Sequence, residues 1–252
     1  MLQSIPVSAH AENSPEQLLR RAMDAKAPAA RARLARRGLA CHARLDRTTH
    51  AMLLRQLYLA LFERREFEEA RRVAESAIEL GVLPDVLHHD AARAAAAEGS
   101  LDEAATHLRA AARRAPASRR ALHWWTLGST FFLAGKYEAA AGALERAVRW
   151  GTHDKPLYRA QLSLVRLASG ERAGDGGELQ STIDALAAAP CGQGYGRFVL
   201  GHLAYASGQF SAARRYLEAF VRRTQAGGTA MRISLDGEVE MSLATLEKIS
   251  HG

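Results

Sequence analysis

The sequence predicts an all-α fold of antiparallel helix pairs, for three reasons. Short amphipathic runs alternate with glycine turns along most of the 252 residues. The pattern of run, turn and run recurs with a period near 34 residues, enough for two short helices and their connections. Alanine and arginine, both good helix formers, dominate the composition, whereas strand-favouring residues are few.

The pattern is clearest in residues 121–150, ALHWWTLGSTFFLAGKYEAAAGALERAVRW. Steps of three and four residues place its apolar side chains on one face of each predicted helix. These side chains are Trp124, Leu127, Gly128 and Phe131, then Tyr137, Ala140, Leu144 and Ala147. Gly135 lies at the reversal, which favours a residue that adopts positive φ. Because Gly128 and Ala140 are small, we expect a close helix approach there, where a larger side chain costs about 1–3 kcal/mol.

Looser copies of this pattern lie on both sides of residues 121–150. The turn glycine recurs at Gly99, 36 residues earlier, and at Gly208, 73 residues later. The period, together with the small and large residues of the central copy, resembles the tetratricopeptide repeat family. This resemblance implies a right-handed superhelical solenoid of about five to six helix pairs, whose first helices line a concave groove, with a C-terminal capping helix.

The expected elements follow in order along the chain. Residues 1–13 are polar and aperiodic, and we expect them to be disordered. Residues 14–250 are expected to form one repeat domain, whose first helix starts at Ser14 and Pro15. Within it we expect clear repeats at 51–84, 85–118 and 121–152, degenerate repeats at 14–47 and 155–190, a further repeat at 194–224 and a capping helix at 234–250. That last helix carries an apolar stripe of Leu235, Val239, Leu243, Leu246 and Ile249.

Two features bear on the compartment in which the protein works. The cysteines, Cys41 and Cys191, form neither a CxxC pair nor a disulfide framework. The N-terminal residues do not resemble a secretory leader, and no segment approaches 18 consecutive apolar residues. We therefore expect a cytoplasmic protein without a membrane span.

A net charge of +7 raises the alternative of nucleic-acid binding. The most basic segment, residues 31–44, contains Arg31, Arg33, Arg36, Arg37 and Arg44. We favour this segment as the second helix of a degenerate repeat over a basic arm, because the end units of solenoids are commonly atypical. Many other arginines stand beside glutamates, as in residues 64–72, so we do not expect nucleic acid to be the partner.

The candidate site consists of the side chains that point away from the helix seam on each first helix. Aromatic and arginine side chains are combined there, as in the hot spots of protein interfaces. The expected contacts are Arg55, Gln56, His89, Asp90, Arg93, Trp125, Ser129, Phe132, Arg159, Arg166, Phe198, His202 and Tyr205. An acidic or mixed hydrophobic-acidic segment complements such a surface. The alternative for the aromatic residues is that they pack against a neighbouring helix.

We expect no catalytic, metal or cofactor site. His88, His89 and Asp90 are adjacent, and neighbouring helical residues point about 100° apart, so they cannot share one ion without His107 or His123. No Ser/His/Asp or Cys/His arrangement appears at a known spacing. The clamp with which some tetratricopeptide proteins grip a C-terminal carboxylate is also absent.

The sequence therefore predicts a non-catalytic adaptor or scaffold that binds a partner peptide or helix in its groove. One alternative is a regulatory or chaperone-like module of a secretion or transcription apparatus. Another is a basic helical module that contacts nucleic acid through residues 31–44. The adjacent Trp124 and Trp125 also leave self-association open.

Overall fold

The structure, a computed structural model, describes residues 14–41, 45–171 and 176–251. The described residues are 83% helical and contain no strand, which confirms the predicted all-α class. The expected disorder of residues 1–13 and the interior of the glycine-rich 170–178 loop lie outside the described residues. The chain divides into two compact units, Met1–His107 and Leu108–Gly252, and the boundary falls within a helix.

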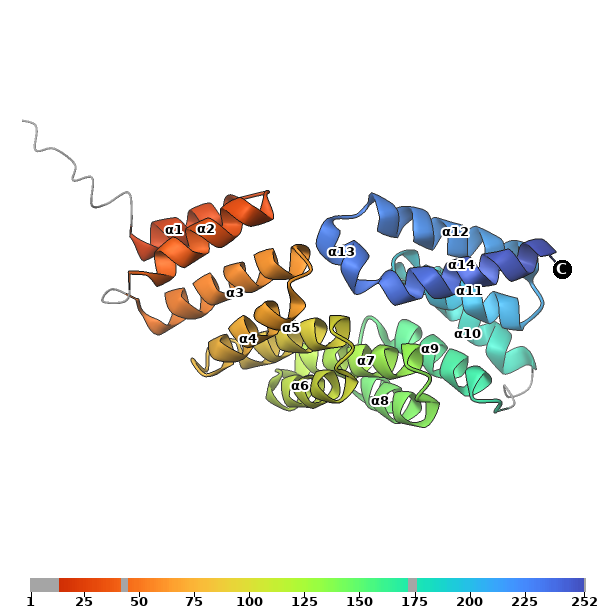
Figure 1. The fold of residues 1–252 in the computed structure, drawn as a ribbon. Helices are drawn as coiled ribbons and strands as arrows, with labels where there is room; N and C mark the ends of the chain where they lie inside the picture. Colours follow the sequence, from red (N-terminus) through yellow and green to blue (C-terminus); the bar gives the residue numbers. More distant parts are fainter. Residues whose placement is uncertain (1–13, 42–44, 172–175, 252) are drawn as a thin grey trace, which may run out of the picture. The chain divides into compact units, whose positions relative to one another are not determined.

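In unit 1 the helices α1 to α5 pack in sequence, each against the next, and the start of α6 follows (Figure 1). They are α1 (Pro15–Asp24), α2 (Pro28–Leu39), α3 (Arg47–Glu63), α4 (Phe67–Ile78), α5 (Pro84–Ala97) and the first half of α6 (Leu101–Arg114). The Ser14 hydroxyl caps α1, as predicted, by accepting a hydrogen bond from the Gln17 backbone N–H at 3.3 Å. The core is formed by large side chains such as Tyr58, Phe62 and Leu87, with alanines between them.

Unit 2 continues the series of helix pairs to the C-terminus. It holds the end of α6, α7 (Ala117–Leu133), α8 (Tyr137–Trp150), α9 (Lys155–Ala168), α10 (Gly176–Ala188), the short 3-10 helix η3 (Pro190–Gln193), α11 (Gly196–Ala206), α12 (Phe210–Ala226), α13 (Thr229–Ser234) and α14 (Asp236–His251). Figure 1 shows α7 beside α8, the hairpin expected from residues 121–150. Gly135 turns this hairpin with φ of 70°, and Gly208 turns α11 into α12 with φ of 72°.

The α7/α8 and α11/α12 hairpins of unit 2 contain the same close contact between a glycine and a leucine. A Cβ on Gly128 would lie 2.6 Å from Cγ of Leu144, and one on Gly201 would lie 2.4 Å from Cδ2 of Leu217. Both leucines are fully buried. The close helix approach predicted at Gly128 is therefore confirmed, and it is repeated in the hairpin of α11 and α12.

The C-terminal helix α14 packs on α12 and α11. Its buried residues are Glu238, Ser242 and Thr245, and Glu238 is hydrogen-bonded to Tyr195, which precedes α11. Of the predicted apolar stripe, Leu235, Val239, Leu246 and Ile249 are half-buried. Leu243 is 48% exposed. Within the described residues, no helix is long and apolar enough to span a membrane.

Candidate partner-binding surfaces

In unit 1, two of the predicted contact residues bind each other. Arg55 Nε on α3 donates to Asp90 Oδ2 on α5 at 2.7 Å. Burial raises the pKa of the Asp90 carboxyl, and the neighbouring Arg55 counteracts this shift. Asp90 is buried and Gln56 is buried as well, so neither is open to a partner. This ion pair joins α3 to α5.

The other predicted contact residues of unit 1 are partly exposed to solvent. Arg93 places its guanidinium 4.7 Å from the centroid of the buried Phe62 ring. Arg93 and His89 are both half-buried. The accessible part of the predicted site in this unit consists of these two side chains and the exposed part of Arg55.

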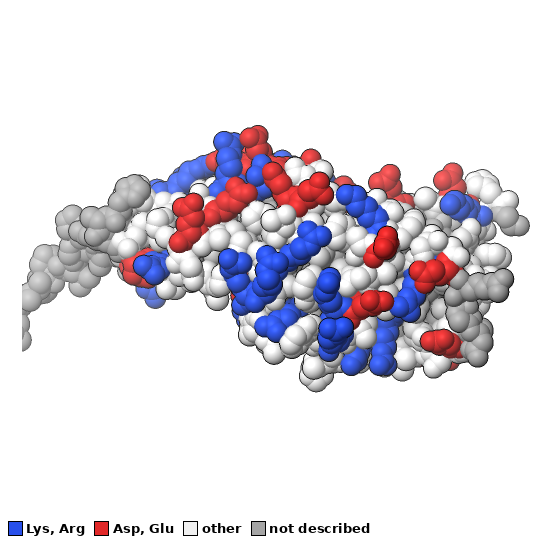
Figure 2. All heavy atoms as spheres, turned by 90° about the horizontal axis from the view of Figure 1, so that it is seen from below, with Lys and Arg blue, Asp and Glu red and all other residues white. Residues whose placement is uncertain are grey.

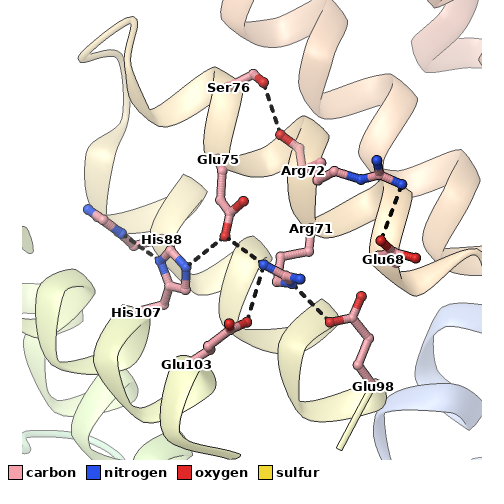
Figure 3. Close-up of polar contacts among 9 residues, drawn as sticks. All are labelled: Glu68, Arg71, Arg72, Glu75, Ser76, His88, Glu98, Glu103 and His107. Carbon is pink, nitrogen blue, oxygen red and sulfur yellow. Dashed lines mark hydrogen bonds and ion pairs between the residues drawn. The ribbon is translucent and has the colours of Figure 1, made fainter. Parts of the chain in front are cut away.

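A polar network in unit 1 was not predicted from the sequence (Figure 3). Arg71 on α4 contacts three carboxylates, those of Glu98 at 2.9 Å and of Glu75 and Glu103 at 3.2 Å each. The hydrogen bond to Glu98 is the main reason that the pKa of Arg71 is raised. The network therefore connects α4, the end of α5 and the start of α6, and Arg71 is its centre.

Two histidines extend this network. His107 Nε2 lies 3.4 Å from Glu75 Oε1, and its Nδ1 lies 3.1 Å from Nδ1 of His88 (Figure 3). The histidine cluster considered as a metal site is thus reduced to a pair of rings in contact. No group of three or more His, Cys, Asp or Glu suited to a metal ion occurs in the part of the chain that the structure describes.

In unit 2, four predicted contact residues lie in the interior. Phe198 packs against Phe132, with ring centroids 6.5 Å apart, and against His202 at 4.6 Å. Ser129 is buried near them, and burial lowers the pKa of His202 to about 4. The first helices α7 and α11 bring these side chains together. Phe132 and Phe198 therefore pack against a neighbouring helix, which was the alternative interpretation of the aromatic residues. In this conformation they do not reach a partner.

Trp125 is half-buried and begins a chain of hydrogen bonds across unit 2. Its Nε1 donates to Gln161 Oε1 on α9 at 2.5 Å, and Gln161 Nε2 donates to the Ser129 hydroxyl at 3.0 Å. Gln161 Nε2 also lies 3.5 Å from the Tyr195 hydroxyl, which donates to Glu238 Oε1 at 3.1 Å. These hydrogen bonds link α7, α9, the start of α11 and α14. Of the residues that form them, only Trp125 and Ser129 were predicted as contact residues.

Glu238 has the least favourable environment of the residues in this series of hydrogen bonds. It is 4% exposed, and its Oε2 has no hydrogen-bond partner within the described residues. Burial raises the pKa of the Glu238 carboxyl to about 7.

Three predicted contacts in unit 2 remain accessible. Arg159 is exposed and makes no ion pair with another described residue. Arg166 is exposed but bonds to Glu145 at 3.0 Å. Tyr205 is half-buried, with its ring 5.7 Å from that of Phe210.

Positive charge is unevenly distributed along the sequence. Between Ala104 and Tyr137 the chain has five arginines and one lysine, and no Asp or Glu. Figure 2 shows, on the face that it draws, a group of Lys and Arg side chains with few acidic neighbours, beside an area where both signs are mixed.

Residues 31–44 contribute to packing within unit 1. They form most of α2, which packs on α1 and α3. Arg31 bonds to Glu63 at 2.7 Å, and Arg36 bonds to Glu69 at 3.1 Å. Arg44 lies outside the described residues. Two of the arginines that a nucleic-acid contact requires are thus already paired with glutamates.

A sequence model of the tetratricopeptide repeat matches residues 89–154 and 198–234. These stretches include the whole of α6, α7, α8 and α12, and with them both close glycine contacts. In these two stretches the chain is similar to the tetratricopeptide repeat. The tetratricopeptide resemblance seen in residues 121–150 is thereby confirmed.

Solved structures are similar to this chain in fold. A crystal structure of the apo form of RapI has a TM-score of 0.56 and 14% identity, covering 98% of this chain and 88% of that chain. The crystal structure of the APC/C hetero-tetramer Cut9-Hcn1 has a TM-score of 0.51 and 14% identity, covering 96% of this chain and 57% of that chain. Such low identities indicate a shared fold alone. No curated protein matches the sequence.

Proposed function

We propose that the protein is a non-catalytic adaptor or scaffold that binds a peptide or helix of another protein along the first helices of unit 2. The observation that carries this proposal is the pair of tetratricopeptide hairpins, α7 with α8 and α11 with α12. Repeats of this kind present the side chains of successive first helices to a ligand. Arg159 on α9 and Tyr205 on α11 are the accessible residues of this surface, with part of Trp125.

The partner segment is acidic or mixed hydrophobic-acidic. Arg159 supports this, because it is an exposed cation without an ion-pair partner among the described residues. Tyr205 and Trp125 supply apolar contact area beside a polar group, a combination common in interface hot spots. The two cysteines are free thiols, which supports the expected cytoplasmic location.

A regulatory or chaperone-like role in a secretion or transcription apparatus requires the same surface. The identity of the partner decides between that role and the role of an adaptor or scaffold. Nucleic-acid binding through residues 31–44 has less support, because Arg31 and Arg36 are held in ion pairs with Glu63 and Glu69.

Site-specific photo-crosslinking tests the proposed surface. A photoreactive amino acid replaces Arg159 or Tyr205 in the full chain, and a matched control replaces Ala139, an exposed residue on the second helix α8. In nuclease-treated native lysate, we expect the first two positions to crosslink the same protein and the control not to. Crosslinks of one protein from all three positions, or from Ala139 alone, would overturn the assignment of the surface.

A further inference from the structure

We propose a second interaction surface on unit 2, formed by the end of α6, the start of α7 and the end of α8, that binds an acidic protein segment carrying apolar side chains. We call it the arginine–tryptophan surface and define it by Arg113, Arg120, Arg146, Arg149, Trp124 and Trp150. It does not depend on the contacts proposed for Arg159 and Tyr205.

The centre of this surface is a reciprocal pair of stacks between α7 and α8. Arg120 on α7 places its guanidinium 4.4 Å from the ring centroid of Trp150 on α8. Arg146 on α8 places its guanidinium 5.0 Å from the ring centroid of Trp124 on α7. Within each helix the arginine and the tryptophan are four residues apart, so they occupy the same face. The stacks hold both guanidinium groups in fixed orientations, which lowers the entropy lost when they bind a carboxylate.

The end of α6 is joined to these stacks. Arg120 Nη2 donates to the backbone oxygen of Ala115 at 3.0 Å, directly after the last turn of α6. That last turn carries Arg113 and Arg114, both exposed. Arg149 is exposed one residue before Trp150. Positive charges from three helices therefore lie around the two indole rings.

Three of these arginines are not neutralised by an ion pair among the described residues, and the nearby Glu145 on α8 pairs with Arg166 instead. None of Arg113, Arg146 and Arg149 forms an ion pair with a residue that the structure describes, unlike Arg31 and Arg71 in unit 1. The acid-free stretch from Ala104 to Tyr137 covers the end of α6 and all of α7. A carboxylate-rich partner is the missing counter-charge, and such attraction between unlike surfaces speeds association and selects the partner.

Helix stability does not explain all of these charges. Arginines in the last turns of α6 and α8 favour the helix dipole. Arg120 stands near the start of α7, where the dipole disfavours positive charge, and the first turn of that helix contains no acidic residue. A cost to the isolated helix at this place is consistent with a role in binding.

The apolar content of the surface favours a protein over a nucleic acid. Trp150 is 41% exposed, and the guanidinium of Arg120 lies over its ring. Each indole ring already has an arginine over one face, so it is a poorer platform for the stacking of successive bases. An acidic segment with leucine or phenylalanine residues matches both parts of the surface.

The test uses the full chain and two labelled probes in fluorescence anisotropy at several salt concentrations. One probe is a 16-residue peptide of Glu and Asp with three Leu or Phe residues, and the other is a 16-nucleotide single-stranded oligo(dT). We expect the peptide to bind more tightly than the oligonucleotide at 150 mM salt. The double variant Arg113→Glu, Arg149→Glu should weaken peptide binding at least tenfold, whereas Arg215→Glu, Arg222→Glu on α12, with the same change of charge, should weaken it less than threefold.

Two further variants test the stacks and the apolar part. Arg146→Lys keeps the charge but loses the planar stack, and Trp150→Ala removes exposed indole surface. We expect each variant to weaken peptide binding at least threefold. When Ser replaces the Leu and Phe residues of the peptide, we expect Trp150→Ala to have no further effect on binding. Equal losses from the α12 control pair would overturn the proposal, as would tighter binding of the oligonucleotide. A larger loss from Arg159→Glu than from Arg113→Glu, Arg149→Glu would show that the peptide binds in the groove of Arg159 and Tyr205, and would overturn the second surface while leaving the groove proposal standing.

Discussion

Gly201 lies where α11 and α12 approach most closely, and its substitution measures how tight that contact is. Gly201→Ala places a Cβ 2.4 Å from Leu217 Cδ2, and Leu217 is fully buried. We expect a loss of about 1–3 kcal/mol in the free energy of unfolding from overpacking. The control, Gly142→Ala on α8, meets no atom within 4 Å and should gain roughly 0.5–1 kcal/mol from helix propensity. Urea denaturation measures both, and a neutral Gly201→Ala would contradict the close contact.

Glu238 makes stability depend on pH in a direction opposite to that of an ordinary surface carboxyl. Its folded pKa of about 7 lies above its ordinary value of 4.5, so the native state holds the proton more tightly. Its contribution is therefore full below about pH 4.5 and decreases as pH rises through 7, by about 3 kcal/mol at most. His202, with its pKa lowered to about 4, acts the other way between pH 6.5 and 4.

The Glu238→Gln variant separates these two effects, because glutamine resembles the protonated carboxyl at every pH. The free energy of unfolding of this variant should equal that of the wild type near pH 4 and exceed it by pH 8. Urea denaturation at pH 4, 6.5 and 8 gives the difference between the two proteins. A difference that stays constant over this range would show that Glu238 is not buried as described.

At the scale of helices, the network around Arg71 stabilises the junction of α4, α5 and α6. Arg71→Met leaves Glu75, Glu98 and Glu103 without their shared cation, and we expect a loss of about 1–3 kcal/mol. The matched control is Arg72→Met, because the Arg72 side chain is 64% exposed and pairs only with the exposed Glu68. The control should change stability by less than about 0.5 kcal/mol. Equal effects of the two substitutions in chemical denaturation would contradict the role of the network.

The sequence predicted the helices and their turns because local spacing determines them. Gly128, Gly135 and Gly208 mark close contacts and reversals that depend on residues nearby in the chain. The hydrogen bond of Glu238 on α14 joins it to Tyr195, more than 40 residues away, and no local period predicts such a partner.

The candidate site was harder to predict for the same reason. Placing residues on first helices was possible from the repeat, but Phe132 and Phe198 lie in the interior because α7 and α11 bring them together. Gln161, Tyr195 and Glu238 join Trp125 through contacts between four segments. The stacks of Arg120 on Trp150 and of Arg146 on Trp124 likewise need the hairpin to be folded before they can be seen.

For the whole molecule, the prediction of one repeat domain over residues 14–250 can be tested with the chain's own fluorescence. All three tryptophans, Trp124, Trp125 and Trp150, belong to unit 2, so their emission reports that unit alone. Circular dichroism reports the helices of both units. If neighbouring repeats unfold together, the two signals have the same midpoint in urea. Midpoints that differ by more than the error of the fits would show two units that unfold independently.

Partner binding along the first helices of unit 2 is tested most directly by calorimetry with the segment that crosslinks to Arg159 and Tyr205. The full chain is compared with the double variant Arg159→Glu, Tyr205→Ala, and with a control that changes Ala139→Glu on α8. We predict that the double variant binds the segment at least tenfold more weakly and that the control binds it as the wild type does. Unchanged affinity in the double variant, with the fold confirmed by circular dichroism, would contradict binding at this surface.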